Sequence, residues 1–311
     1  MLACAEVGLV TAWLMWGSQP GTGTVGGMSD SGGAAQDGDG FAARCAADRA
    51  FLGMVLAGDA RASFPLTGAL ARHDGRLYGG AAVAAAVALA EHASGRRSLW
   101  TTVQFVSAAA VVGDRIDCEV KVLASGRRTS QVRVTGRLDG QELFCAVGAT
   151  AALKERAVTG VFEKAPLVAE PEDCELFRFP IPAHLRDVAG PELDRHMELR
   201  IARRSGDAVR PEGQLLFWAR VRDRLATPAI LGYLVDMVPM SVVHAAGRMG
   251  GGTSLDNTLR VGQAADTEWV LLQLDPHLAL GGYGHGTAQV WSPDGLLMAT
   301  ASQTASLLVL D

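Results

Sequence analysis

The stretch from Gly79 to Ala93, GGAAVAAAVALAEHA, is apolar on every side of a helix, and its charged and imidazole side chains, Glu91 and His92, lie near its end. A helix that is apolar all round belongs in the interior of a protein. Four strand-like stretches follow, separated by turn residues: Ser98 to Ala108, Arg115 to Leu123, Thr129 to Leu138 and Glu142 to Leu153. The pattern predicts one buried helix followed by an antiparallel meander.

The second half of the chain repeats this order of elements. A second apolar helix is predicted from about Pro228 to Gly247, and Pro239 is placed to kink it. The strand-like stretches of this half lie at His196 to Ala202, Gly213 to Val221, Ser254 to Val261, Glu268 to Asp275, His285 to Trp291 and Leu296 to Leu310. Both halves therefore predict a buried helix and a sheet of strands that are adjacent in sequence.

Two pairs of anchors set the register of the repeat. Ser98-Leu99 recurs as Ser254-Leu255, 156 residues later, and the turn Asp139-Gly140 recurs as Asp294-Gly295, 155 residues later. Two offsets that agree to one residue indicate a duplication. The predicted class is α+β, with two tandem domains that each hold a long buried helix wrapped by an antiparallel sheet.

The repeat divides the chain into four parts. Residues 1–45 are predicted to be a tail that is disordered or precedes the true start, because Met28 offers a second start and Ser29 to Gly40 favours coil. The apolar run Val7 to Trp16 is too short to span a bilayer. Residues 46–153 form the N-terminal domain, and residues 192–311 form the C-terminal domain. Residues 154–191, rich in proline and acidic side chains, are predicted to be a surface crossover.

The composition excludes several classes of function. A formal net charge of -5 leaves no basic surplus for a phosphate backbone, so nucleic acid is not an expected partner. Five scattered cysteines without a CxxC pair predict neither disulfides nor a zinc site, and they favour the reducing cytoplasm. A GxGxxG pattern at Gly21, Gly23 and Gly26 follows Pro20 instead of a strand, so no dinucleotide is expected. No metal, other cofactor, signal peptide or membrane span is expected either.

Three polar residues distinguish the second copy from the first. Asp236 lies within the apolar second helix, where the first helix has no acid; Asp256 stands where the first copy has Trp100. Gln303 falls opposite Ala149 when the two Asp-Gly turns are aligned and one residue is counted as inserted in the first copy. Each could be structural, through an ion pair, solvent contact or a turn, but a buried carboxylate needs partners or a shifted pKa. Because all three lie in one copy, the second domain is predicted to carry the chemistry.

Five short anchors occur in order along the chain: Leu77-Tyr78-Gly79-Gly80, Ser125-Gly126-Arg127-Arg128-Thr129, Leu231-Gly232-Tyr233-Leu234-Val235-Asp236, Ser254-Leu255-Asp256 and Ala301-Ser302-Gln303. In this order and spacing, from about Asp48 to Leu310, the chain resembles the TesB-like acyl-CoA thioesterases of type II. The resemblance implies a double hotdog fold. It also implies hydrolysis of acyl-CoA thioesters to free acid and CoA, as part of fatty acid metabolism.

In that family an Asp on the second core helix, a Ser or Thr at the start of the following strand and a Gln on the last strand hold the attacking water. The resemblance maps these catalytic roles onto Asp236, Ser254 and Gln303. Two positions depart from the family pattern. Asn257 stands where a His is usual, and Ala81 stands where a Gln is common.

The chemistry of a thioester fits these few groups. A thiolate leaves without strong acid assistance, so a positioned water and donors for the developing oxyanion are the main requirements. Those donors are expected to be backbone N–H groups near the N-terminus of a core helix, and no GxSxG motif suggests a covalent route. Two alternatives stay open: a non-catalytic acyl-CoA binding protein, and a hotdog enoyl-thioester hydratase or dehydratase with His244 or His285 facing Asp236. Acyl-chain length and oligomeric state, monomer or homo-oligomer, are left unspecified.

Overall fold

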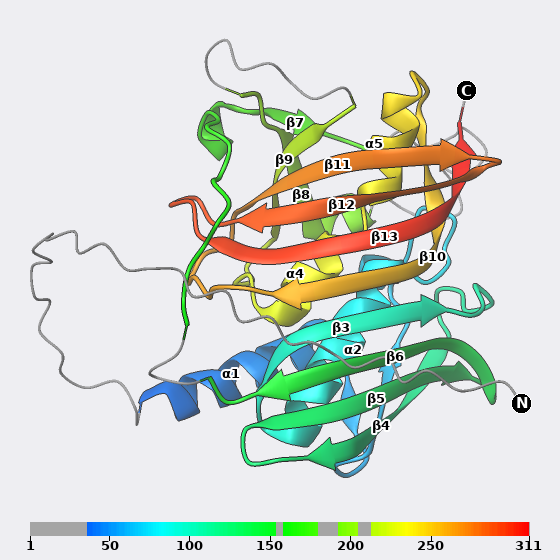
Figure 1. The fold of residues 1–311 in the computed structure, drawn as a ribbon. Coiled ribbons are helices and arrows are strands. Elements are labelled where there is room, and N and C mark those ends of the chain that lie inside the picture. The colour runs from blue at the N-terminus through cyan, green and yellow to red at the C-terminus, as the bar shows by residue number, and fades with distance from the viewer. Residues whose placement is uncertain (1–35, 154–157, 180–191, 205–212, 311) are drawn as a thin grey trace, which may run out of the picture.

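In the part of the chain that the structure describes, thirteen strands form one continuous antiparallel sheet that wraps around the central helices (Figure 1). The computed structural model describes residues 36–153, 158–179, 192–204 and 213–310. Over these residues the strand order is β1-β2-β4-β5-β6-β3-β10-β13-β12-β11-β9-β8-β7. All strands of the first half of the chain lie on one side of this order and all strands of the second half on the other, so two units are joined edge to edge.

The first unit contains one long core helix and the strands that cover it. Its elements are α1 (Gln36–Phe51), β1 (Val55–Leu56), β2 (Arg61–Pro65), η1 (Gly68–Leu70), α2 (Gly79–Ser94), β3 (Arg97–Phe105), β4 (Arg115–Ser125), β5 (Thr129–Leu138) and β6 (Gln141–Ala151). The predicted helix and its four strands are confirmed as α2 and β3 to β6, with ends displaced by a few residues. The sequence interpretation missed the helix α1 and the short strands β1 and β2.

The second unit repeats this plan. Its elements are η2 (Pro171–Asp173), β7 (Glu175–Phe177), α3 (Glu192–His196), β8 (Met197–Ile201), β9 (Leu215–Val221), α4 (Pro228–Leu234), α5 (Val238–Ala245), β10 (Gly250–Val261), β11 (Val270–Leu280), β12 (Tyr283–Trp291) and β13 (Leu297–Val309). The predicted strands are confirmed as β8 to β13.

The two units meet where β3 pairs with β10. In this pairing Thr102 lies opposite Thr258, and their Oγ1 atoms are 3.0 Å apart. These two residues are 156 apart in the sequence, which is the offset of the Ser-Leu anchors. A residue that pairs with its own counterpart marks a pseudo-twofold axis, so the structure confirms the duplication and the double hotdog arrangement.

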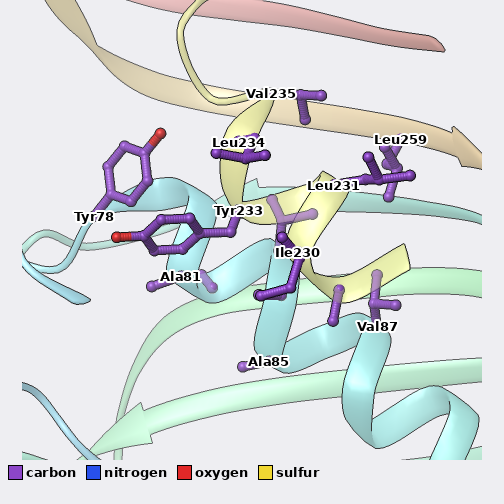
Figure 2. Close-up of a cluster of buried hydrophobic side chains, with 14 of the residues drawn as sticks. Tyr78, Ala81, Ala85, Val87, Ile230, Leu231, Tyr233, Leu234, Val235 and Leu259 are labelled. Carbon is purple, nitrogen blue, oxygen red and sulfur yellow. The ribbon is translucent and has the colours of Figure 1, made fainter. Parts of the chain in front are cut away.

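The helices α2 and α4 pack side by side at the centre of the molecule. Every residue of α2 from Gly79 to Glu91 is buried, and small side chains let α4 approach closely: a Cβ added to Gly232 would lie 2.8 Å from Val83 Cγ1. Figure 2 shows Ala81 and Ala85 of α2 beneath the side chains of α4. This dense alanine contact explains why the first helix could tolerate no polar residue before Glu91.

The second core helix is broken, whereas the sequence predicted one helix from Pro228 to Gly247. Helix α4 ends at Leu234, α5 begins at Val238, and Asp236 lies in the break. Pro239 has no N–H and so is tolerated in the first turn of a helix but not in its interior. The proline therefore starts a new helix instead of kinking a single one.

The segment Pro228–Ala245 is long and apolar enough to cross a membrane by composition alone, but 72% of it is buried within the protein. That degree of burial is typical of a core helix.

Two predicted domain boundaries need correction. The predicted tail, 1–45, includes the beginning of α1, which is ordered because Cys45 and Leu52 are buried against the core; residues 1–35, with the GxGxxG pattern, lie outside the described residues. The predicted crossover, 154–191, contains β7, which pairs with β8 and so belongs to the second sheet. The short strand β7 was missed because its pairing with β8 joins segments that are separated in the sequence. Such pairing leaves no pattern in the spacing of nearby apolar residues.

Candidate active site

The Asp236 carboxylate is the centre of a hydrogen-bonded cluster. Its Oδ1 atom accepts hydrogen bonds from Ser254 Oγ at 2.9 Å, from Asn257 Nδ2 at 3.3 Å and from Gln303 Nε2. Its Oδ2 atom accepts from the backbone N–H of Gly80 at 2.9 Å. The structure thus brings together the three residues predicted from the sequence, and it adds Gly80 and Asn257 to them.

Strand pairing explains how Ser254 and Gln303 reach the carboxylate. Gln303 of β13 lies opposite Asn257 of β10, so both side chains point to the same face, toward the break between α4 and α5. Gln303 Oε1 accepts from the Val238 N–H at 3.2 Å, which orients Nε2 toward Asp236 and toward Ser254 Oγ, 2.7 Å away. The Gln303 amide oxygen therefore accepts from a backbone N–H in the first turn of α5. Its amide nitrogen donates to Asp236 and Ser254 and so holds the cluster in place.

Asp256, which the comparison of the two copies made a candidate for the site, supports a strand instead. Its Oδ1 atom accepts from the Thr304 N–H at 2.9 Å, next to the irregular pairing between Ser254 and Asp256. This bond secures the bulge that lets Ser254 turn toward Asp236. Asp256 has no bond to the carboxylate cluster, so we assign it to the strand and not to the site.

The environment of Asp236 shifts its acidity. Burial raises the pKa of the Asp236 carboxyl from 3.8 to about 6, although hydrogen bonds from Ser254, Asn257 and Gly80 act in the opposite direction. Asp236 is half-buried, so part of its surface remains accessible. A partly accessible carboxylate with a pKa near 6 is ionised at neutral pH and basic enough to accept a proton.

The accessible side of Asp236 opens into a cavity of about 210 Å³ at the junction of the two units. The cavity is lined by Arg72, Leu77, Tyr78, Gly79, Phe105, Val106, Ser107, Ala108, Leu143, Asp236, Gly252, Thr253, Ser254 and Leu255. Arg72 forms an ion pair with Asp74 and donates to Thr253 Oγ1 at 3.2 Å. The walls are mainly apolar, and Asp236 and Ser254 place polar groups among them, as in sites that bind small molecules.

The N-terminus of α2 forms one side of the cluster. No side chain caps α2, because its N-cap residue is Tyr78, and the Gly80 N–H is satisfied by Asp236 from the other unit. A Cβ added to Gly79 would lie 2.5 Å from Asp236 Oδ2, and one added to Gly80 would lie 2.2 Å from Tyr233 O. Gly79 therefore permits the carboxylate to approach the positive end of the helix dipole, which favours its ionised form, and Gly80 permits the close approach of α4.

The first copy cannot form the same cluster. The residue that occupies the place of Gln303 is Gly148, because Thr101, the counterpart of Asn257, pairs with Gly148. The predicted match with Ala149 was wrong by one residue, because it assumed a residue inserted in the first copy. Both copies have the same register shift, between Ser98 and Trp100 and between Ser254 and Asp256, so no residue is inserted. A Cβ at Gly148 would lie 2.6 Å from Trp100 O, so no glutamine fits there.

Helix α1 packs against the N-terminus of α4, which corresponds to the N-terminus of α2. Thr227 Oγ1, the cap of α4, bonds to Asp48 Oδ1 at 2.6 Å. Glu91 accepts from the Ser98 N–H at 2.7 Å, and Cys45 Sγ lies 3.6 Å from it. Burial raises the pKa of Asp48 to about 6 and that of Glu91 to about 7. These acids are held in the core beside a cavity of only about 70 Å³.

The histidines of the rival hydratase hypothesis lie elsewhere. His244 is exposed and lines a different cavity, with Met240 and Arg203. His285 is also exposed, and its ring lies 5.8 Å from that of His277. Within the described part of the chain neither histidine hydrogen-bonds to Asp236, and no group of three or more His, Cys, Asp or Glu side chains is arranged to hold a metal ion. The Asp/His pair that the hydratase reading needs is therefore not formed.

Two family models match the chain. Residues 171–307 match the family model of the acyl-CoA thioesterase C-terminal domain, and residues 70–153 match that of the acyl-CoA thioesterase N-terminal domain. No protein of curated function matches the chain.

Several solved structures share the fold. A Novosphingobium aromaticivorans protein, provisionally assigned as a thioesterase, is 29% identical with a TM-score of 0.73, over 83% of this chain and 99% of its own. An acyl-CoA thioesterase II from Mycobacterium marinum is 17% identical with a TM-score of 0.65, over 84% and 98%. A tesB protein from Mycobacterium avium subs paratuberculosis is 18% identical with a TM-score of 0.65, over 85% and 99%. The chain therefore belongs to the acyl-CoA thioesterase family, as a double hotdog that hydrolyses acyl-CoA thioesters.

Proposed function

We propose that Asp236, Ser254 and Gln303 hold the water that attacks the thioester carbonyl of an acyl-CoA. The observation that carries this proposal is the convergence of Ser254 and Gln303 on a single oxygen of a partly accessible carboxylate. Because the three groups lie within hydrogen-bonding distance of one another, one water placed over them can contact all three. Such positioning converts a collision with solvent into a directed attack.

The proposed reaction needs only these groups and the substrate. As the water oxygen bonds to the carbonyl carbon, one of its protons passes to the Asp236 carboxylate, and the carbonyl π electrons move to oxygen. The carbon–sulfur bond then breaks, the CoA thiolate leaves with the bonding electrons, and the carbonyl re-forms as the free acid. The proton on Asp236 returns to the thiolate or to solvent, which restores the carboxylate.

The proposal is tested by the release of free thiol from a panel of acyl-CoAs. We expect Asp236→Asn to lower kcat by about 10²- to 10⁴-fold, the usual contribution of a general base. Asp256→Asn is a matched control, because its remaining oxygen can still accept from the Thr304 N–H; it should keep kcat within a few-fold. A folded Asp236→Asn protein with more than a tenth of the wild-type kcat would contradict the proposal.

We also propose that the substrates are fatty acyl-CoAs and that hydrolysis takes place in the cytoplasm. The apolar cavity walls, which include Leu77, Phe105 and Leu143, support an aliphatic acyl group. Free cysteines at Cys45, Cys118, Cys145 and Cys174 support a reducing compartment. The dependence of kcat/KM on acyl-chain length tests the first part of this proposal, and cell fractionation tests the second.

A further inference from the structure

The hydroxyl group of Tyr78 is a buried donor without a partner in the described part of the chain. Only 6% of the Tyr78 surface is exposed, and its Oη atom makes no hydrogen bond there. Buried hydroxyl groups in proteins nearly always have a partner. The partner of Tyr78 is therefore expected to come from outside the chain, and the surroundings of the ring indicate which molecule supplies it.

Tyr78 lies beside the carboxylate cluster. It lines the same cavity as Asp236 and Ser254. A Cβ added to Gly80 would lie 2.6 Å from Tyr78 Cε1, the ring carbon next to the one that bears the hydroxyl group, and the Gly80 N–H bonds to Asp236. Burial, with a further contribution from the Asp236 charge, raises the pKa of Tyr78 well above its ordinary value. The phenol thus stays protonated and remains a donor at neutral pH.

A second tyrosine holds the ring in place. Tyr233 packs edge-on against Tyr78, with ring centroids 5.1 Å apart and an interplanar angle of 78°. Figure 2 shows that the two hydroxyl groups point in different directions. Tyr233 Oη donates to Ala69 O at 2.5 Å, so its hydrogen bond is used within the fold. The Tyr233 hydroxyl group therefore has a structural hydrogen bond, whereas the Tyr78 hydroxyl group has no partner in the described part of the chain.

We propose that Tyr78 donates a hydrogen bond to the carbonyl oxygen of the bound thioester and stabilises the oxyanion that forms when water adds. The inference rests on the proposed function, because it takes Asp236 to hold the attacking water. A carbonyl group in the cavity would then have the nucleophile on the Asp236 side and the fixed phenol at its oxygen. A preorganised donor gains strength as negative charge develops, so its main effect is on kcat and not on KM.

The test compares Tyr78→Phe with the matched control Tyr233→Phe. Tyr78→Phe should lower kcat by about 100-fold, a typical effect of removing one oxyanion donor, with KM changed by less than about threefold, since ground-state binding changes little. Its thermal midpoint should not fall, because no protein hydrogen bond is lost. Tyr233→Phe should lower the thermal midpoint and keep most of kcat, since its hydroxyl group serves Ala69.

A spectroscopic measurement distinguishes a catalytic from a merely structural role. The probe is a ketone analogue of the acyl-CoA, with CH₂ in place of sulfur and a ¹³C-labelled carbonyl, bound to the folded protein. The wild-type protein should shift the carbonyl stretch to lower frequency, and Tyr78→Phe should remove most of that shift.

The outcomes separate this inference from the function on which it rests. If Tyr78→Phe keeps kcat within threefold, or leaves the carbonyl frequency unchanged, while Asp236→Asn is inactive, the role of Tyr78 is overturned and the water site stands. If Asp236→Asn remains active, the water site itself fails. A combined loss of kcat and of the carbonyl shift in folded Tyr78→Phe supports the inference.

Discussion

Replacing Gly79 by alanine should displace the Asp236 carboxylate and slow hydrolysis. The added Cβ would lie 2.5 Å from Oδ2 and 3.0 Å from Cγ of Asp236, whereas nonbonded carbon atoms prefer about 3.5–4.0 Å. The carboxylate must then retreat by roughly 1 Å, and a misplacement of this size costs on the order of 10²-fold in rate. It cannot retreat freely, because it accepts hydrogen bonds from Gly80, Ser254, Asn257 and Gln303.

The effect on stability should be small. Alanine in place of glycine favours a helix by up to about 1 kcal/mol, and a weakened hydrogen bond to Asp236 would cost about the same amount. We therefore expect kcat to fall about 100-fold while the free energy of unfolding changes little. The two measurements are thiol release under saturating substrate and equilibrium unfolding in urea.

Gly251→Ala is the matched control for this substitution. Gly251 lies on β10 near the same cavity, and a Cβ added there would have no atom within 4 Å. Its activity should equal that of the wild type. If Gly79→Ala kept more than a third of the wild-type kcat, the carboxylate would not be pinned as the structure indicates, and the reasoning about the glycine pair would be refuted.

Two further predictions concern the buried acids. Because Asp236 must be ionised to accept a proton and burial raises its pKa to about 6, kcat/KM should fall as the pH drops through about 6; a profile that stays level down to pH 4.5 would exclude Asp236 as the base. Burial also raises the pKa of Glu91 from 4.5 to about 7, so the ionised form is disfavoured by folding, and the wild type should lose up to roughly 3 kcal/mol as the pH rises from 4.5 to 7. Glu91→Gln keeps an acceptor for the Ser98 N–H and avoids this loss, so urea unfolding should show the variant gaining stability over the wild type at pH 8 but not at pH 4.5; an equal difference at both values would contradict it.

Much of the architecture followed from local patterns. Apolar periodicity located α2 and most of the strands, since a buried helix and half-buried strands impose their own spacing on the sequence. The Ser-Leu and Asp-Gly anchors revealed the duplication, and the pairing of Thr102 with Thr258 reproduces their offset. The choice of Asp236 as the centre of the site rested on one physical argument, the cost of an acid within an apolar helix.

Other features depend on contacts between distant segments. The position of Gly148 is set by its pairing with Thr101 on the neighbouring strand, and the order in α1 depends on the burial of Cys45. Neither leaves a trace in the spacing of nearby residues. The break before α5 was visible only as a proline, and its position relative to Asp236 depends on the Val238 N–H finding Gln303 Oε1.

The site itself combines both kinds of information. The comparison of the two copies indicated Asp236 and Gln303, because polar side chains are unusual in an apolar core, and the family resemblance added Ser254. The hydrogen bond from Gly80 to Asp236 joins residues 156 apart, and the placement of Tyr78 against the same cluster follows from it. The contacts of Gly80 and Tyr78 with the Asp236 cluster form only when one copy packs on the other. They therefore cannot be predicted from the local sequence pattern of either copy.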